Sequence, residues 1–263
     1  MINKKNKKFA DNYADSAVVQ KEIIKRLIQR LSFINISPER ILDIGSGIGL
    51  GTEKLFEHYS QSEYFMLDKS FQSLNSGYIA NENISMVCAD FKNICFKDNS
   101  FDFIFSSSAL HWDLDVKSSF QEIYRILRPG GLLLFSTYGP DTLIELRSAW
   151  AQVDDNKHVN EFYDMHDIGD LMLNINFIDT VVDAEKIVID YDNVKQLQLD
   201  LKNIGSKVMK DPNKLSSLSA KSKMKLMYAE YEKFKNSSGN LPATYEVIYG
   251  SAWKKFNVVN LNN

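Results

Sequence analysis

The sequence is poor in cysteine, in proline and in net charge. Its 263 residues include two cysteines and five prolines, and the formal net charge is −3. Cys88 and Cys95 have no neighbouring cysteine or histidine at metal-ligand spacing, so we expect two buried or half-buried free thiols and neither a disulfide nor a metal site. The small net charge gives no reason to expect nucleic acid as a partner.

Long apolar runs are missing as well. No segment approaches the roughly 18 consecutive apolar residues of a membrane span, and no apolar signal core follows the lysine-rich N-terminus. We therefore expect a cytoplasmic protein without a membrane partner. Apolar residues make up 44% and charged residues 25%, which is ordinary for a globular chain, and the length suits one α/β domain with an insertion or cap.

Short apolar runs alternate with helical patterns in the first half of the chain. This alternation predicts a parallel sheet whose strands are joined by helical crossovers. Ligands of such sheets bind at the carboxyl ends of the strands, where the strand order reverses. The predicted strands are 40–44, 64–68, 84–90, 101–107 and 131–137, the predicted helices are 52–58, 71–79 and 116–127, and the strand ends carry 45–51, Asp68, Asp90 and 106–112.

The flanking segments predict further elements. An apolar stripe over 18–31 predicts a helix, with Ser16 placed to cap it. The later predicted elements are helices at 141–153 and 164–176, strands at 177–191 and 243–249, and a polar, largely helical segment at 192–240 between those strands.

The first predicted strand ends in a glycine-rich loop at 43–51. Glycines let a backbone turn sharply and approach a ligand closely, although a turn without a ligand is the alternative. A dinucleotide fingerprint needs glycine at its first, third and sixth positions, but the sixth position here is Leu50 or Thr52, depending on the starting glycine. Asp43 also argues against a nearby pyrophosphate. It suits a cationic ligand such as S-adenosylmethionine, or holds the loop through hydrogen bonds.

Two further predicted strands end in aspartate. The Asp68 carboxylate can accept both hydroxyls of a ribose, with capping of the next helix as the alternative. Asp90 can accept from an exocyclic amine while Phe91 flanks a base, with a simple turn as the alternative.

Together these residues resemble the class I S-adenosylmethionine-dependent methyltransferases. The stretch 43–49 matches the first motif of that family, and Asp68 and Asp90-Phe91 match its ribose and adenine contacts. Arg-Pro-Gly-Gly-Leu at 128–132 matches the turn into its fifth strand. The resemblance covers about residues 38–137. It implies an α/β Rossmann-like fold with a mostly parallel seven-stranded sheet, an antiparallel edge hairpin, helices on both faces and a helical insertion.

The resemblance also implies a domain organisation and a cofactor site. Residues 1–37 would form an N-terminal helical segment that covers the site, and 38–263 the methyltransferase domain, with the cofactor-binding core at 38–138 and the insertion at 192–240. The implied cofactor is S-adenosylmethionine, which leaves as S-adenosylhomocysteine, and no metal is implied. The implied cofactor-binding residues are Asp43, Gly45, Ser46, Gly47, Asp68, Lys69, Asp90, Phe91 and Ser106.

Segments outside these motifs resemble a narrower family, the malonyl-acyl-carrier-protein O-methyltransferases of biotin synthesis. That resemblance implies methylation of the free carboxylate of a malonyl thioester, and a partner, acyl carrier protein carrying malonyl-phosphopantetheine. It spans nearly the whole chain, and the segments that carry it are 9–13, 19–20, 136–147, 158–169, 199–205 and 241–253.

Other acceptors are weighed against this one. The segment 106–113 lacks the Asn/Asp-Pro-Pro-aromatic motif of methylases that act on bases, and no basic-aromatic run is present, so nucleic acid is disfavoured. Parts of 139–147 and 242–245 also resemble respiratory complex I assembly factors. A methyltransferase acting on another small acid or a quinone-like ring, or an assembly-factor-like protein, therefore remains the alternative.

A carboxylate acceptor demands little of catalytic side chains. With a pKa of about 4 it is ionised at neutral pH and needs no general base. The site must align it with the methyl group and remove its water. No side chain is therefore assigned a catalytic role, and the candidates for positioning, each with structural packing as the alternative, are Tyr13, His111, Trp112, Tyr138 and Arg147.

Overall fold

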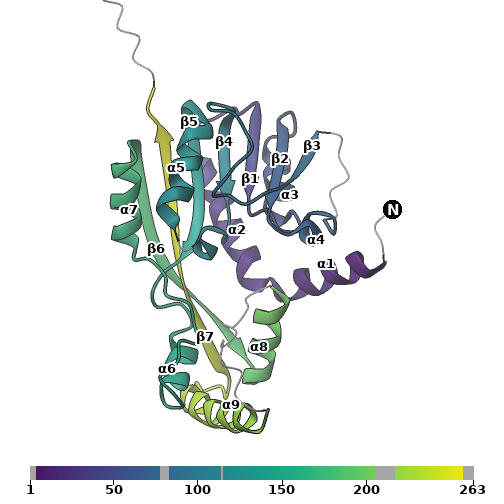
Figure 1. The fold of residues 1–263 in the computed structure, drawn as a ribbon, viewed down its shortest axis with the longest axis vertical. Coiled ribbons are helices and arrows are strands. Elements are labelled where there is room, and N and C mark those ends of the chain that lie inside the picture. Colours follow the sequence, from purple (N-terminus) through teal and green to yellow (C-terminus); the bar gives the residue numbers. More distant parts are fainter. Residues whose placement is uncertain (1–3, 78–82, 114, 205–216, 257–263) are drawn as a thin grey trace, which may run out of the picture.

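The computed structural model describes residues 4–77, 83–113, 115–204 and 217–256, and its centre is a seven-stranded sheet in the order β3-β2-β1-β4-β5-β7-β6 (Figure 1). The first five strands pair in parallel, and β7 pairs antiparallel with both β5 and β6. The predicted mostly parallel sheet with an antiparallel edge hairpin is thus confirmed. The strands are β1 (Arg40–Ile44), β2 (Glu63–Asp68), β3 (Ile84–Cys88), β4 (Phe101–Ser106), β5 (Leu127–Tyr138), β6 (Phe177–Tyr191) and β7 (Leu241–Lys254).

Helices cover both faces of the sheet because the central strands are apolar on both sides. In β1, Ile41 packs with α2 (Val18–Arg30) and α3 (Leu50–His58), whereas the next residue, Leu42, packs in a separate cluster with α5 (Val116–Ile126) and α7 (Met165–Asn174). Successive side chains of a strand point to opposite faces, so a continuous apolar run indicates burial on both.

The remaining helices lie beside the sheet and beyond the end of its long hairpin. In Figure 1, α6, α8 and α9 gather where β7 begins, and α1 reaches toward α8. α1 packs on α8 and α6 packs on α9. These helices are α1 (Lys4–Ser16), α4 (Phe71–Leu74), α6 (Ile144–Ala151), α8 (Val194–Asn203) and α9 (Ser217–Tyr231), and the 3-10 turns are Leu31–Phe33, Leu110–Trp112 and Glu232–Phe234.

The predicted insertion at 192–240 contains α8 and α9, and its residues 205–216 lie outside the described residues. The last part of the helix predicted at 71–79 does so too. Within the described ranges, no helix has the length and apolar character needed to cross a bilayer.

The predicted role of Ser16 is wrong. α1 continues to Ser16, and Ala17 alone separates it from α2, so Ser16 ends one helix instead of capping the next. Its hydroxyl accepts a hydrogen bond from the Asn203 side chain at 3.0 Å, which joins α1 to the end of α8.

The predicted burial of the cysteines is also wrong. Cys88 and Cys95 are free thiols, as expected, but both are exposed. Cys88 ends β3, the outermost strand on its side of the sheet, whose side chains are all half-buried or exposed. An apolar run does not reveal whether its strand lies at the edge.

Candidate active site

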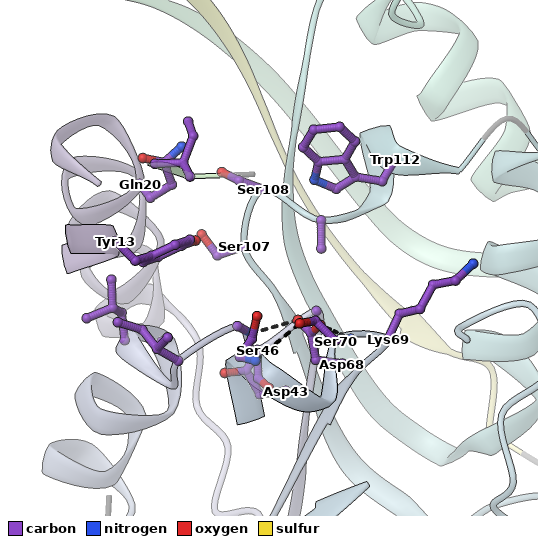
Figure 2. Close-up of a pocket in the computed structure, with 18 of the residues that line it drawn as sticks. Tyr13, Gln20, Asp43, Ser46, Asp68, Lys69, Ser70, Ser107, Ser108 and Trp112 are labelled. Atoms are coloured by element: carbon purple, nitrogen blue, oxygen red, sulfur yellow. Dashed lines mark hydrogen bonds between the residues drawn. The ribbon is translucent and has the colours of Figure 1, made fainter. Parts of the chain in front are cut away.

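A cavity of about 820 Å³ opens at the carboxyl ends of the parallel strands, and its volume is typical of a small-molecule site. The loops after β1, β2, β3 and β4 form its floor, and α1, α2 and the end of α8 contribute the other walls. It lies where the strand order reverses between β1 and β4, the position expected for a ligand of this fold. Figure 2 shows the side chains converging on it from these segments.

The glycine-rich loop after β1 forms part of the cavity floor, and two of its positions require glycine. Gly45 and Gly47 have φ of 69° and 57°, in the left-handed region that residues with a Cβ rarely adopt. A Cβ on Gly45 would lie 2.2 Å from the Cβ of Ala109, so that glycine lets two loops pack together. A Cβ on Gly47 would meet only the Tyr13 side chain, whose hydroxyl oxygen lies 3.7 Å away. Gly47 therefore borders the cavity with space in front of it.

Asp43 lies beneath this loop and is 2% exposed. Its carboxylate accepts a hydrogen bond from the Thr52 hydroxyl at 2.6 Å and so ties the strand to the first turn of α3. Burial, helped by the nearby charge of Asp68, raises the pKa of Asp43 to about 7. Of the two roles left open by the sequence, the structure shows the one that holds the loop, although Asp43 also lines the cavity.

The raised pKa of Asp43 predicts a pH-dependent stability. Between about pH 4 and pH 7 the folded protein keeps this proton while the unfolded chain has lost it, so the free energy of unfolding should fall as pH rises through that window. The contribution is on the order of 2–4 kcal/mol. Urea unfolding of the wild type and of Asp43→Asn between about pH 4 and pH 8 measures it. The variant should show a shallower fall, and equal slopes would contradict the assignment.

Asp68 joins the loops that follow β1 and β2. One carboxylate oxygen accepts the backbone N–H of Gly47 at 2.9 Å, and the other accepts that of Ser70 at 2.7 Å (Figure 2). A carboxylate can accept about four hydrogen bonds in all, so both oxygens retain capacity for hydroxyls of a ligand.

A salt bridge crosses the floor between the loops after β2 and β3. Lys69 Nζ lies 2.7 Å from the Asp90 carboxylate, and this hydrogen bond lowers the pKa of Asp90. Lys92, the next lysine along the cavity wall, pairs in turn with the buried Asp113 at 2.6 Å. Phe91 lies between Asp90 and Lys92 in the sequence, lines the cavity and is half-buried. Two of the lysines at this cavity are therefore already neutralised.

A second, smaller cavity of about 60 Å³ adjoins the first. Four residues line both cavities and form a junction between them, namely His111, Trp112, Tyr138 and Ile204. The His111 ring lies 4.7 Å from the Trp112 ring and 4.6 Å from the Tyr138 ring, centroid to centroid. Burial among these rings lowers the pKa of His111 to about 3, so its imidazole is neutral at pH 7.

Most of the buried polar atoms that lack a partner face the larger cavity. Among the described residues, eight buried side-chain atoms make no hydrogen bond, and five of them belong to cavity-lining residues. Such atoms are rare in folded proteins and indicate where a ligand supplies the missing bonds. The five are Gln20 Oε1, Ser46 Oγ, Ser107 Oγ, Ser108 Oγ and His111 Nδ1. Together with Asp68 and Asp90 they make the cavity suited to polar ligands, of which S-adenosylmethionine is one.

Comparisons with known proteins agree with this geometry. Residues 42–135 match the family described as a methyltransferase domain. The chain is 40% identical over 244 residues to malonyl-acyl-carrier-protein O-methyltransferase 1 of Coxiella burnetii, covering 93% of this chain and 84% of that protein. It is 38% identical over 256 residues to the malonyl-acyl-carrier-protein O-methyltransferase of Legionella pneumophila, covering 96% and 90%. The chain belongs to the malonyl-acyl-carrier-protein O-methyltransferase family. It is an S-adenosylmethionine-dependent O-methyltransferase, and the resemblance noted in the sequence is confirmed.

Solved structures place this family member among proteins of the same fold. The YcgJ protein of Bacillus subtilis superposes with a TM-score of 0.62 at 17% identity, covering 89% of this chain and 98% of that one. Phosphoethanolamine N-methyltransferase 2 of Haemonchus contortus, solved with S-adenosylhomocysteine, has a TM-score of 0.58 at 19% identity, covering 95% and 60%.

Two residues that the sequence predicts at the site, Ser106 and Arg147, line neither cavity. Ser106 is fully buried, and its hydroxyl donates to the Ile44 carbonyl at 3.0 Å. Arg147 donates to the carbonyls of Pro140 at 2.7 Å and Thr142 at 3.2 Å, and lines neither cavity. Its guanidinium therefore holds the turn after β5.

Segments typical of the malonyl-acyl-carrier-protein O-methyltransferases interlock in the structure. The Glu246 carboxylate on β7 accepts the N–H of Asp141 at 2.7 Å. The buried Glu145 carboxylate accepts both the N–H of Thr244, at 3.0 Å, and its hydroxyl. These bonds fasten the turn after β5 to β7, and that turn and the first part of α6 line the smaller cavity.

Other cavity residues are not among the site residues that the sequence predicts. Ser107 and Ser108 belong to the stretch expected at the end of β4, but the prediction there is Ser106. Gln20 lay in a stretch that carries the family resemblance. Lys202 and Asn203, at the end of α8, lie in the stretch 199–205 that carries the family resemblance, and the basic charge of Lys202 suits an acidic carrier. Tertiary packing, including that of α8 on α1, brings them to the cavity. In the described ranges, no group of three or more His, Cys, Asp or Glu side chains could hold a metal.

Proposed function

We propose that this enzyme transfers a methyl group from S-adenosylmethionine to the free carboxylate of a malonyl thioester on acyl carrier protein, giving the methyl ester for biotin synthesis. The relatives named malonyl-acyl-carrier-protein O-methyltransferase support this acceptor. The structural observation that carries it is the junction between the two cavities, where aromatic rings surround a neutral imidazole. Such a site suits a nucleophile that is already ionised.

The larger cavity would hold the cofactor along its floor. Asp68 would accept the ribose hydroxyls, and Asp90 would accept from the adenine amine beside Phe91 while keeping Lys69 as its second partner. The remaining proposed contacts are Asp43, Gly45, Ser46 and Gly47. When bound, S-adenosylmethionine supplies an electrophilic methyl group on its sulfonium.

The N-terminal helices would cover the bound cofactor. Tyr13 of α1 and Gln20 of α2 both line the cavity, and Tyr13 faces the glycine-rich loop at Gly47. Burial, with the charges of Asp68 and Asp43, raises the pKa of Tyr13 to about 12, so its hydroxyl stays protonated at neutral pH. A segment that packs against the site in this way would exclude water during transfer.

The acceptor carboxylate would reach the methyl group at the junction of the cavities. No base is required, because a malonyl carboxylate with a pKa of about 4 is ionised at neutral pH. Removal of its water raises its reactivity, and alignment by the surrounding rings lowers the entropic cost of meeting the methyl group. Proposed positioning residues are Tyr13, His111, Trp112 and Tyr138, while Arg147 would act only through the turn that it holds.

The proposal is tested by comparing acceptors with labelled S-adenosylmethionine. Malonyl-carrier should be methylated, whereas acetyl-carrier lacks the nucleophile and should give no product. Methylation of a phenolic or quinone-like ring, with malonyl-carrier untouched, would overturn the assignment.

Carrier binding should depend on salt. Lys202 is exposed at the cavity wall and has no ion-pair partner among the described residues, so it is suited to meet an acidic carrier. Raising salt from about 50 to 300 mM should raise the KM for malonyl-carrier roughly 3–10-fold and change that for malonyl-pantetheine less than twofold. Lys202→Glu should raise the carrier KM more than Lys195→Glu, an exposed charge change on the same helix. If salt changes the KM values for the two substrates equally, Lys202 does not belong to a carrier-docking surface.

A further inference from the structure

Four polar side chains meet where the junction borders the larger cavity, and the proposed cofactor contacts do not include them. They are His111 and Tyr138 of the junction, with Gln20 and Ser108 of the larger cavity. Gln20 Nε2 donates to the Tyr138 hydroxyl at 3.4 Å, which leaves Gln20 Oε1 without a partner. Ser108 Oγ and His111 Nδ1 are buried without a hydrogen bond of normal geometry, and Ser108 Oγ lies beside the Tyr138 hydroxyl. Figure 2 shows Gln20 and Ser108 facing each other on the side of the cavity away from Asp68. The arrangement joins α2 to the loop after β4 and to the last residue of β5.

The backbone of Ser108 holds its side chain in place under strain. Its φ is 52°, in the left-handed region that non-glycine residues rarely adopt. Its N–H donates to the Ser136 hydroxyl at 3.0 Å and to the Ser136 carbonyl at 3.2 Å. Strain of this kind is kept where the surrounding structure over-determines a conformation, and it gathers at functional sites.

The side chains at this junction are all neutral at pH 7. Burial keeps His111 neutral by lowering its pKa, and burial also raises the pKa of Tyr138, so its hydroxyl stays protonated. Lys69 and Lys92 are paired with aspartates, and the Arg147 guanidinium is bonded to backbone carbonyls. Among the described cavity-lining residues, the one cation without an ion-pair partner is therefore Lys202, which is exposed.

Neutrality suits a reaction that cancels charge. A carboxylate and a sulfonium become an ester and a thioether, so both charges have diminished in the transition state. A cation paired with the carboxylate would stabilise the ground state more than the transition state and slow the step. Neutral hydrogen bonds satisfy the buried carboxylate with less of this penalty.

We infer that the acceptor carboxylate binds at this junction through neutral hydrogen-bond donors, the Gln20 amide, the Ser108 hydroxyl and the His111 imidazole, and not through a cation. The inference rests on the proposed function and names its acceptor subsite. Rotation of the Gln20 amide by half a turn lets its oxygen accept from the Tyr138 hydroxyl and frees its nitrogen to donate.

Charge substitutions at Gln20 test this subsite. The substrate is malonyl-pantetheine, which removes carrier docking, and S-adenosylmethionine affinity is measured by calorimetry on each variant. Gln20→Glu should lower kcat/KM at least 30-fold by repelling the carboxylate, with cofactor affinity within about threefold of wild type. Gln20→Lys should lower KM yet lower kcat about tenfold, because the carboxylate is then bound too well. The matched controls Gln29→Glu and Gln29→Lys, exposed on the same helix, should leave both constants unchanged.

Several outcomes would overturn the inference. Gln20→Lys with an unchanged or raised kcat would show that a cation serves the step, and Gln20 variants that behave like the Gln29 variants would remove Gln20 from the subsite. Ser108→Gly suits the left-handed backbone, removes the hydroxyl, and should raise KM about fivefold. It decides the matter if the Gln20 variants do not fold, since an unchanged KM would exclude the subsite. Wild-type enzyme that does not methylate malonyl-pantetheine or malonyl-carrier would instead refute the proposed function itself.

Discussion

Gly47→Val is expected to reduce S-adenosylmethionine binding by at least 100-fold while the chain still folds. The valine side chain would project into the cavity, since the nearest protein atom to its Cβ is the Tyr13 hydroxyl oxygen at 3.7 Å. A β-branched residue at a φ of 57° would also distort the loop whose N–H meets Asp68. Calorimetric titration measures the affinity, and thermal unfolding reports the fold.

Gly45→Ala separates a binding defect from a folding defect in the same loop. Its Cβ would lie 2.2 Å from the Ala109 Cβ, so we expect a clear loss of thermal stability in addition to weaker binding. If Gly47→Val folds and binds the cofactor within a few-fold of wild type, the loop does not cradle the ligand as argued.

Asp68→Ala should weaken S-adenosylmethionine binding by about 1.5–3 kcal/mol, because a charge-assisted acceptor for the ribose is lost. The substitution should also lower the free energy of unfolding by about 1–2 kcal/mol, because Asp68 accepts the N–H groups of Gly47 and Ser70. Calorimetry and urea unfolding measure the two effects separately.

Asp68→Asn is the matched control for this change. It keeps the size of the side chain and one acceptor oxygen, so its losses in binding and stability should both lie between those of wild type and alanine. An affinity unchanged in Asp68→Ala would remove this carboxylate from the cofactor site.

The parallel part of the sheet could be predicted from the sequence because its signals are local, whereas the antiparallel edge hairpin is implied by the family resemblance. Each buried strand is a short apolar run, and the turn after β1 shows its glycines directly. The acids at Asp68 and Asp90 follow from the same logic, since parallel strands end at one edge of the sheet. Exposure of Cys88 could not be predicted in this way, because it depends on which strand lies outermost.

The rest of the site depends on tertiary contacts. The sequence predicts Ser106 at the site, whereas Ser107 and Ser108 line the cavity, because the residue at which β4 ends decides which serine faces the ligand. The sequence predicts Arg147 as a positioning residue, but its hydrogen-bond partners are carbonyls five and seven residues earlier, on a turn whose shape the sequence does not reveal. No local sequence pattern reveals that α2 and α8 converge near the junction, because their positions depend on how the helices pack.

The position of the transferred methyl group tests the central claim most directly. The enzyme is incubated with S-adenosylmethionine carrying a deuterated methyl group and with malonyl-carrier, and the carrier is analysed by tandem mass spectrometry. The account predicts one labelled methyl per malonyl group, located on the terminal carboxyl as an ester that mild base removes. A carrier that stays unlabelled under conditions where the enzyme binds S-adenosylmethionine, or a label found anywhere other than that carboxyl, would contradict it.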